Sequence, residues 1–122
     1  PAACGTAEAS MPSHIVVIGA GPIGLDAAVS ARVSGIAVTL IERGSTVGAA
    51  VRAWSHVKMF SPNAENMSQA GLAALGEFGR PTPSPAVCPT GSEFCDGYLE
   101  PLCRWLEEQD DCEVLLHTNV DS

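Results

Sequence analysis

The sequence predicts an α/β fold, a three-layer domain built on a parallel sheet that is incomplete in this chain. Residues 15–18 are a continuous run of apolar, β-branched residues, which suits a parallel strand buried on both faces. Three glycines follow with G-x-G-x-x-G spacing, and a second apolar run over residues 36–41 ends at Glu42. Strand, glycine turn, helix, strand and acid in this order form a Rossmann-like, dinucleotide-binding βαβ unit.

The glycine turn is the predicted pyrophosphate site. Gly19 would make the tight turn, Gly21 would let the backbone approach phosphate, and Gly24 would let the helix pack on the strand. Pro22 suits the first helical turn, where its missing N–H costs nothing. Free N–H groups and the positive end of the helix dipole attract an anion. The candidate residues are Gly19, Ala20, Gly21, Pro22, Ile23 and Gly24.

A helix is expected from about residue 22 to residue 34, with Gly35 as its C-cap. Glu42 would then stand at the carboxyl end of the second strand, where an acid accepts hydrogen bonds from ribose hydroxyls. Arg43 beside it would tolerate a 2′-phosphate. The competing interpretation is a glycine-rich turn in some other α/β domain.

Residues 44–50 are expected to form a flexible loop before a segment that contains Arg52 and Trp54. Gly48 would bring backbone close to phosphate or the ribityl chain, Arg52 would pair with pyrophosphate, and Trp54 would line a ring pocket. The alternative, weighed equally, is that Trp54 is a core contact and Arg52 a surface charge. No catalytic residue is identified, and His56 is better explained as a structural or surface histidine.

The rest of the chain completes the pattern loosely. Residues 61–91 are expected to be loop-like, with a short helix within residues 64–75 and a proline-rich loop over residues 81–89. Residues 90–93 have the form of a capping box, and an amphipathic helix follows that Pro101 should kink or divide near Gly97. Residues 112–116 should form a third strand.

Composition excludes several classes of protein. Residues 61–122 contain eleven acidic and two basic residues, and the whole chain has a net charge of −8, which disfavours nucleic-acid binding. No apolar run approaches the roughly 18 residues of a membrane span. Five cysteines lack zinc-ligand spacing, so we expect no metal site and a cytoplasmic or other reducing compartment. Residues 1–13 are expected to be an N-terminal extension, with Met11 as the native start, and residues 14–122 a partial dinucleotide-binding Rossmann domain.

Residues 14–43 resemble the N-terminal FAD-binding segment of the two-dinucleotide-binding-domain flavoproteins. This group includes flavin-containing monooxygenases, N-hydroxylases and pyridine nucleotide-disulfide oxidoreductases. The resemblance implies that residues 21–24 hold the pyrophosphate of FAD, that Glu42 holds the adenosine ribose, and that the backbone near Val120 contacts adenine. Gly48 stands where the family often has a Gly-Gly pair leading to arginine and tryptophan, here Arg52 and Trp54. Residues 49–60 lack the cysteine pair of the disulfide reductases, which favours a monooxygenase-like member.

The predicted function is therefore the FAD-binding portion of a flavin-dependent, NAD(P)H-using oxidoreductase. The resemblance implies that NAD(P)H binds a second site outside this chain, and that the chain is a fragment without activity of its own. Two alternatives are an NAD(P)-binding domain of a dehydrogenase and a non-catalytic, Rossmann-like subunit of a larger assembly. In either case the rest of the parent protein or a partner subunit would cover the exposed sheet edge.

Overall fold

Three parallel strands form the framework of the computed structural model, which describes residues 13–121. Strand β1 (His14–Ile18) pairs with β2 (Ala37–Ile41), and β2 pairs with β3 (Cys112–Leu115), so the sheet order is β1-β2-β3. Ile18 lies opposite Ile41, and Ile41 lies opposite Leu115. The three strands therefore end together, and the loops that follow them meet at one edge of the sheet.

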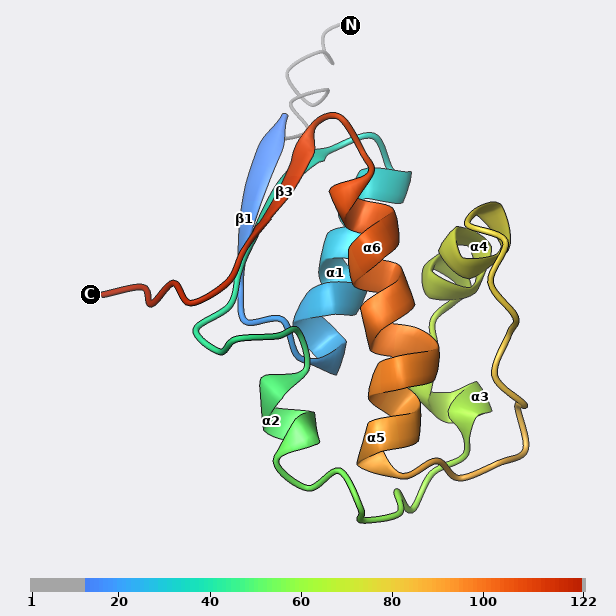
Figure 1. Cartoon of the computed structure of the whole chain (residues 1–122). Helices are drawn as coiled ribbons and strands as arrows, with labels where there is room; N and C mark the ends of the chain where they lie inside the picture. Colours follow the sequence, from blue (N-terminus) through green and yellow to red (C-terminus); the bar gives the residue numbers. More distant parts are fainter. Residues whose placement is uncertain (1–12, 122) are drawn as a thin grey trace, which may run out of the picture.

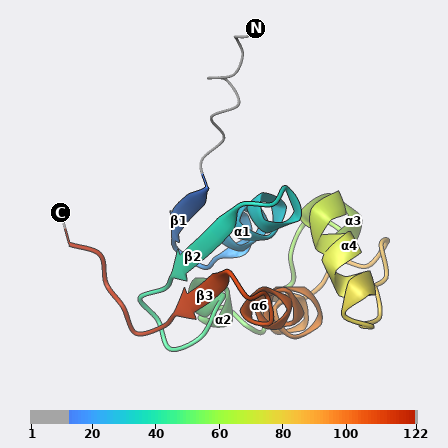
Figure 2. The same ribbon diagram turned by 90° about the horizontal axis from the view of Figure 1, so that it is seen from above.

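Helix α1 (Pro22–Val33) connects β1 to β2, and the remaining helices belong to the connection that follows β2 in the chain and leads to β3. These are α2 (Ala49–Arg52), α3 (Asn63–Asn66), α4 (Gln69–Glu77), α5 (Gly91–Phe94), the π-helical turn η2 (Cys95–Leu99) and α6 (Glu100–Glu107). Figure 2 shows α1 and α6 side by side on one face of the sheet. Helix α4 packs against both of them (Figure 1).

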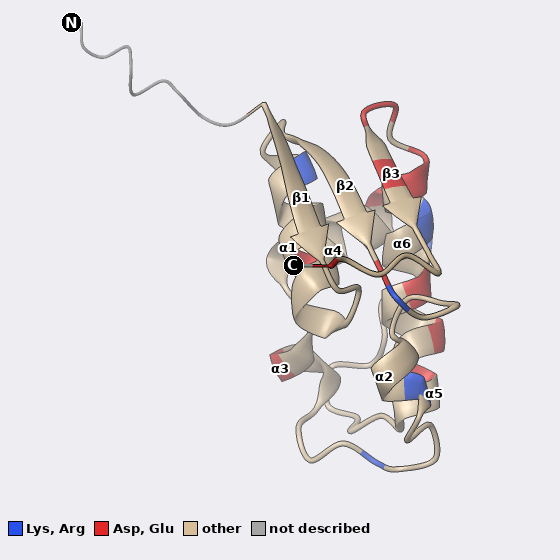
Figure 3. Ribbon diagram, turned by 90° about the vertical axis from the view of Figure 1, so that its left-hand side faces the viewer, with Lys and Arg blue, Asp and Glu red and all other residues tan. Residues whose placement is uncertain are grey.

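The opposite face of the sheet is open among the described residues. Val16 and Ile18 of β1 expose 57% and 67% of their surface, whereas Val38 and Leu40 of β2 are fully buried under the helices. Figure 3 looks onto this open face, and the acidic residues in this view gather toward β3 and toward α6, which lies behind the sheet. The predicted class is confirmed: a Rossmann-like parallel sheet with helices, incomplete in this chain.

Several local predictions are also confirmed. Helix α1 is present and ends at Val33, but its C-cap is Ser34 and not Gly35, which takes the left-handed position just after the cap with a φ of +88°. The capping box is present, because the Thr90 hydroxyl accepts from the Glu93 N–H at 3.1 Å and the Glu93 carboxylate accepts from the Thr90 N–H at 2.9 Å. Pro101 lacks an N–H, and the helix before it widens into the π-helical turn that contains Gly97.

Two local predictions need correction. Residues 44–50 are not all loop, because α2 begins at Ala49 behind Gly48, whose left-handed φ of 68° turns the chain into the helix. One short helix was expected within residues 64–75, whereas the structure has two there, α3 and α4. Ser68 is extended and caps α4 by accepting from the Gly71 N–H at 2.9 Å, so the segment divides into α3 and α4.

The proline-rich loop over residues 81–89 contains no helix or strand. Its carbonyl groups accept hydrogen bonds that attach it to the segment over residues 59–64. Those of Pro85 and Pro89 accept hydrogen bonds from Ala64 and Met59 at 3.0 and 2.7 Å. Proline lacks an N–H but keeps its carbonyl acceptor. The predicted extension falls almost entirely on residues 1–12, outside the described residues. No helix within residues 13–121 is both long and apolar enough to span a bilayer.

Candidate dinucleotide-binding site

The turn after β1 requires glycine at two positions. Gly19 has a φ of +101°, a conformation that costs other residues energy, and its N–H donates to the Ile41 carbonyl at 2.7 Å. A Cβ on Gly24 would overlap the Gly19 carbonyl oxygen. The first turn of α1 thus packs directly on the strand-to-helix turn, which is the packing role expected for the third glycine.

The side chain of Glu42 connects this turn with the loop after β2. Its Oε1 accepts a hydrogen bond from the Ala20 N–H at 2.8 Å, and its Oε2 accepts one from the Gly44 N–H at 2.7 Å. A Cβ on Gly44 would lie 2.9 Å from Oε2 and 2.6 Å from the Ala49 Cβ, so glycine is needed there. A carboxylate can accept about four hydrogen bonds, which leaves Glu42 with capacity for ribose hydroxyls.

A cleft of about 370 Å³ lies where the three strands end. This is the position at which open α/β sheets bind ligands. Five of the twelve predicted site residues line the cleft: Gly19, Gly21, Glu42, Arg43 and Val120. The other lining residues are Ile18, Ile41, Ala49, Ala50, Thr118 and Asn119.

Five predicted residues lie behind or beside this cleft. Ala20 is fully buried, and its carbonyl accepts from the Gly48 N–H at 2.8 Å. Gly24 packs beneath the turn, as described above. Pro22 and Ile23 line a different cavity of about 290 Å³, which also includes Met59. The structure therefore brings the glycine turn, Glu42 and Val120 together at the cleft. Pro22 and Ile23, the first residues of α1, line the other cavity instead.

Arg52 and Trp54 also lie outside the cleft lining. The Arg52 guanidinium donates to Asp96 and Glu100 at 2.7 and 2.8 Å, and the hydrogen bond with Asp96 is the main cause that raises the pKa of Arg52. Trp54 packs on Gly91, where a Cβ would lie 2.9 Å from the indole ring. The position of Trp54 agrees with the interpretation of a core contact, whereas Arg52, expected in that interpretation to be a surface charge, is partly buried and paired with two carboxylates.

Six cleft residues are outside the predicted set: Ile18, Ile41, Ala49, Ala50, Thr118 and Asn119. Thr118 is placed by its N–H, which donates to the Glu42 carbonyl at 3.0 Å, and thereby extends the β2–β3 pairing past the end of β3. The sequence signal that could have identified Thr118 and Asn119 is that they are two polar residues just after the third strand, at the edge of the sheet where ligands bind. Ala49 and Ala50 come from α2, which the sequence pattern had assigned to a loop.

A buried tyrosine supports the helix that opens at the glycine turn. The Tyr98 hydroxyl donates to the Asp26 carboxylate at 2.8 Å and accepts from the Ser68 N–H at 3.0 Å. Burial is the main cause that raises the pKa of Tyr98 to about 12. These bonds tie α1 to η2 and to the start of α4.

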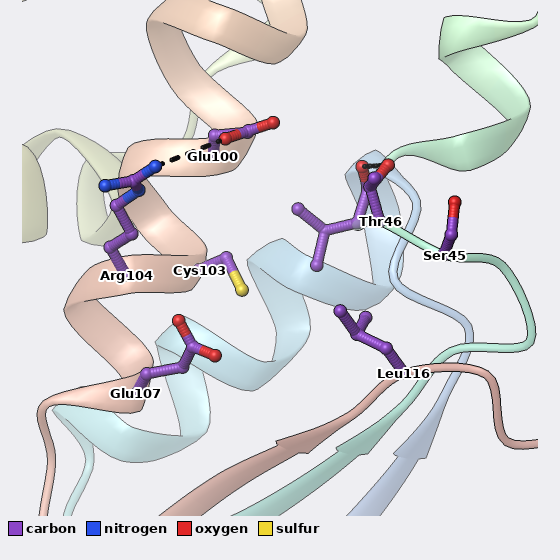
Figure 4. A pocket seen from close by; sticks show the side chains of 8 residues that line it. Ser45, Thr46, Glu100, Cys103, Arg104, Glu107 and Leu116 are labelled. Carbon is purple, nitrogen blue, oxygen red and sulfur yellow. Dashed lines mark hydrogen bonds and ion pairs between the residues drawn. The ribbon is translucent and has the colours of Figure 1, made fainter.

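A second cavity, of about 320 Å³, lies between α6 and the loop over residues 45–47 (Figure 4). Glu100 and Arg104 line its rim, and Leu116 and Cys103 contribute apolar surface. Burial raises the pKa of Cys103 to about 12, so its thiol stays protonated at neutral pH.

The described cysteines Cys88, Cys95, Cys103 and Cys112 are all free, and residues 13–121 contain no cluster of three or more metal-ligating side chains.

The parallel sheet, the close-packed glycine turn and the cleft at the strand ends define a Rossmann-like domain of the dinucleotide-binding class. The chain belongs to the pyridine nucleotide-disulphide oxidoreductase family, whose model matches residues 16–104. No curated protein sequence is detectably similar to it.

Two solved structures share the fold. Histamine dehydrogenase from Rhizobium sp. 4-9 is 17% identical with a TM-score of 0.55, and the match covers 91% of this chain but 12% of that one. The THI4 protein of Thermovibrio ammonificans is 17% identical with a TM-score of 0.54, and the match covers 90% of this chain and 40% of that one. The chain therefore spans less than half the length of either structure.

Proposed function

We propose that this chain carries the FAD-binding part of a flavin-dependent, NAD(P)H-using oxidoreductase of a monooxygenase-like kind. The observation that carries the proposal is the cleft in which the glycine turn, Glu42 and Val120 meet. Its volume is at the lower end of the roughly 300–1,000 Å³ typical of small-molecule sites, which suits one nucleotide half of FAD. Membership in the oxidoreductase family supports the same conclusion.

In this proposal each part of the cleft has its own task. Backbone N–H groups around Gly21 and the positive end of α1 hold the pyrophosphate. Glu42 accepts the ribose hydroxyls, and the backbone near Val120 contacts adenine. FAD supplies the redox chemistry when bound, and the protein supplies position and electrostatics. NAD(P)H would bind a second site outside this chain.

The monooxygenase-like assignment depends on cysteine placement. Residues 49–60, where the disulfide-reductase members carry a cysteine pair, contain no cysteine. Cys95 and Cys103 are buried, and burial raises the pKa of both thiols, which suppresses thiolate chemistry. Free thiols at these positions also suit a reducing compartment.

The test is cofactor binding by the full-length protein. We expect purified protein to carry flavin absorbance and the stripped protein to bind FAD more tightly than NADH or NADPH. Gly24→Val should abolish FAD binding, whereas Gly76→Ala, at an open position in α4, should leave it unchanged. A folded protein that binds NADH but no FAD would overturn the proposal in favour of a dehydrogenase domain.

A further inference from the structure

Helix α2 has two sides with different tasks. Ala49 and Ala50 line the nucleotide cleft, whereas Arg52, the last residue of the same helix, does not. Arg52 instead reaches across to η2 and α6, where it pairs with Asp96 and Glu100. Two residues of the cleft wall and the arginine of the ion-pair cluster therefore belong to the same four-residue helix.

We infer that Arg52 is a positioning residue, which fixes α2 against η2 and α6 and thereby holds the Ala49–Ala50 wall of the cleft in place. It does so without contacting the cofactor phosphate. The inference rests on the proposed function, since it concerns how the same site binds FAD. It also replaces the pyrophosphate contact that the sequence suggested for Arg52.

The electrostatics around Arg52 argue against a phosphate contact. One guanidinium nitrogen, Nη2, donates to both carboxylates, at 2.7 and 2.8 Å. Arg104 also approaches Glu100, at 3.8 Å, so two arginines and two carboxylates balance one another and Arg52 offers no excess positive charge to an anion. A phosphate that approached the guanidinium would come close to two carboxylates that already hold charge-assisted hydrogen bonds with Nη2.

Helix α2 needs such external anchors because four residues are too few to hold a helix alone. One anchor is the Gly48 N–H, which donates to the Ala20 carbonyl at 2.8 Å. Another is close packing on η2, since a Cβ on Gly48 would lie 3.0 Å from Leu99 and 3.1 Å from the Cys95 sulfur. Arg52 fixes the other end of the helix to the same η2–α6 segment.

The two roles predict opposite results when the carboxylates are neutralised. If Arg52 positions α2, Asp96→Asn/Glu100→Gln should weaken FAD binding about as much as Arg52→Ala does, by roughly five- to tenfold. If Arg52 binds phosphate directly, the same double substitution should free the guanidinium and leave FAD binding unchanged or tighter. The dissociation constant of FAD is measured by equilibrium dialysis with the full-length protein.

Exchanging the charges of positions 52 and 96 tests the ion pair itself, because a recovery of FAD binding would not be expected from a variant that is merely less stable. Arg52→Glu alone should weaken FAD binding, and Arg52→Glu/Asp96→Arg should restore it to within about threefold of wild type. A direct phosphate contact predicts no rescue, because position 52 would still carry a negative charge. Urea unfolding without FAD verifies that each variant is folded.

Arg104→Ala is the matched control. It removes an arginine that also approaches Glu100, at 3.8 Å, but lies on α6 away from α2, and FAD affinity should stay at the wild-type value. Failure of the inverted pair to restore binding would overturn the positioning role alone. Absence of FAD binding by the folded wild-type protein would overturn both this inference and the proposed function.

Discussion

The carboxylate of Glu42 accepts a hydrogen bond from the Ala20 N–H at 2.8 Å, although the two residues are 22 positions apart. The same carboxylate accepts from the Gly44 N–H. Glu42 therefore joins the glycine turn to the loop after β2 before any ligand is considered. The acid expected to hold ribose also sets the shape of the site.

Replacing Glu42 should affect stability as well as ligand binding. Glu42→Gln leaves one of the two N–H donors facing an amide NH₂, and hydrogen bonds to charged groups contribute about 1.5–3 kcal/mol. We expect the free energy of unfolding in urea to fall by about 1–2 kcal/mol. Glu113→Gln, at an exposed position on β3, is the control and should leave stability unchanged. Equal stability of the two variants would contradict the structural role of Glu42.

The contact between Gly24 and Gly19 predicts a steric effect. Gly24→Ala places a methyl group on the Gly19 carbonyl, and overpacking of this kind costs about 1–3 kcal/mol. Gly76→Ala, in the last turn of α4 with open space for the methyl group, should instead stabilise by about 0.5–1 kcal/mol, because alanine has a higher helix propensity and fewer unfolded conformations than glycine. Urea unfolding of both variants measures the difference. A destabilised Gly76→Ala or a neutral Gly24→Ala would refute this explanation.

Tyr98 predicts a change at alkaline pH. Its pKa is raised from 10.0 to about 12, so its contribution to stability is complete below pH 10 and is lost as the pH rises toward 12. Tyr98→Phe also removes the bonds to Asp26 and Ser68, and should cost about 1–2 kcal/mol near neutral pH. The variant should therefore lose less stability than wild type between pH 10 and 12. Urea unfolding at several pH values tests this, and parallel pH profiles would contradict it.

Cys103 adds a second alkaline transition, because burial raises its pKa from 9.0 to about 12. Its contribution to stability is lost as the pH rises from about 9 toward 12. At pH 8 the protonated, buried thiol should react slowly with iodoacetamide. Mass spectrometry of peptides should find Cys103 labelled more slowly than the partly exposed Cys88. Urea at a denaturing concentration is the control and should make the two rates similar, whereas equal rates in the native protein would argue against the burial of Cys103.

Local sequence patterns were sufficient for the elements whose signals lie within a few residues. The apolar runs of β1 and β2, the glycine spacing and the capping box at Thr90 each depend on neighbouring residues. The division of the helix before Pro101 was predictable for the same reason, since proline removes an N–H from the helix that contains it. The short helix α2 was not, because four residues have too weak a local preference.

The sequence by itself determined the fold class, the order of elements along the βαβ unit, and the positions of the glycine turn and Glu42. Only the tertiary structure decided which side chains face the cleft. Arg52 is drawn away by Asp96 and Glu100, 44 and 48 residues later, and Trp54 is held against Gly91. Contacts between residues so far apart depend on packing between elements, which spacing along the chain does not encode.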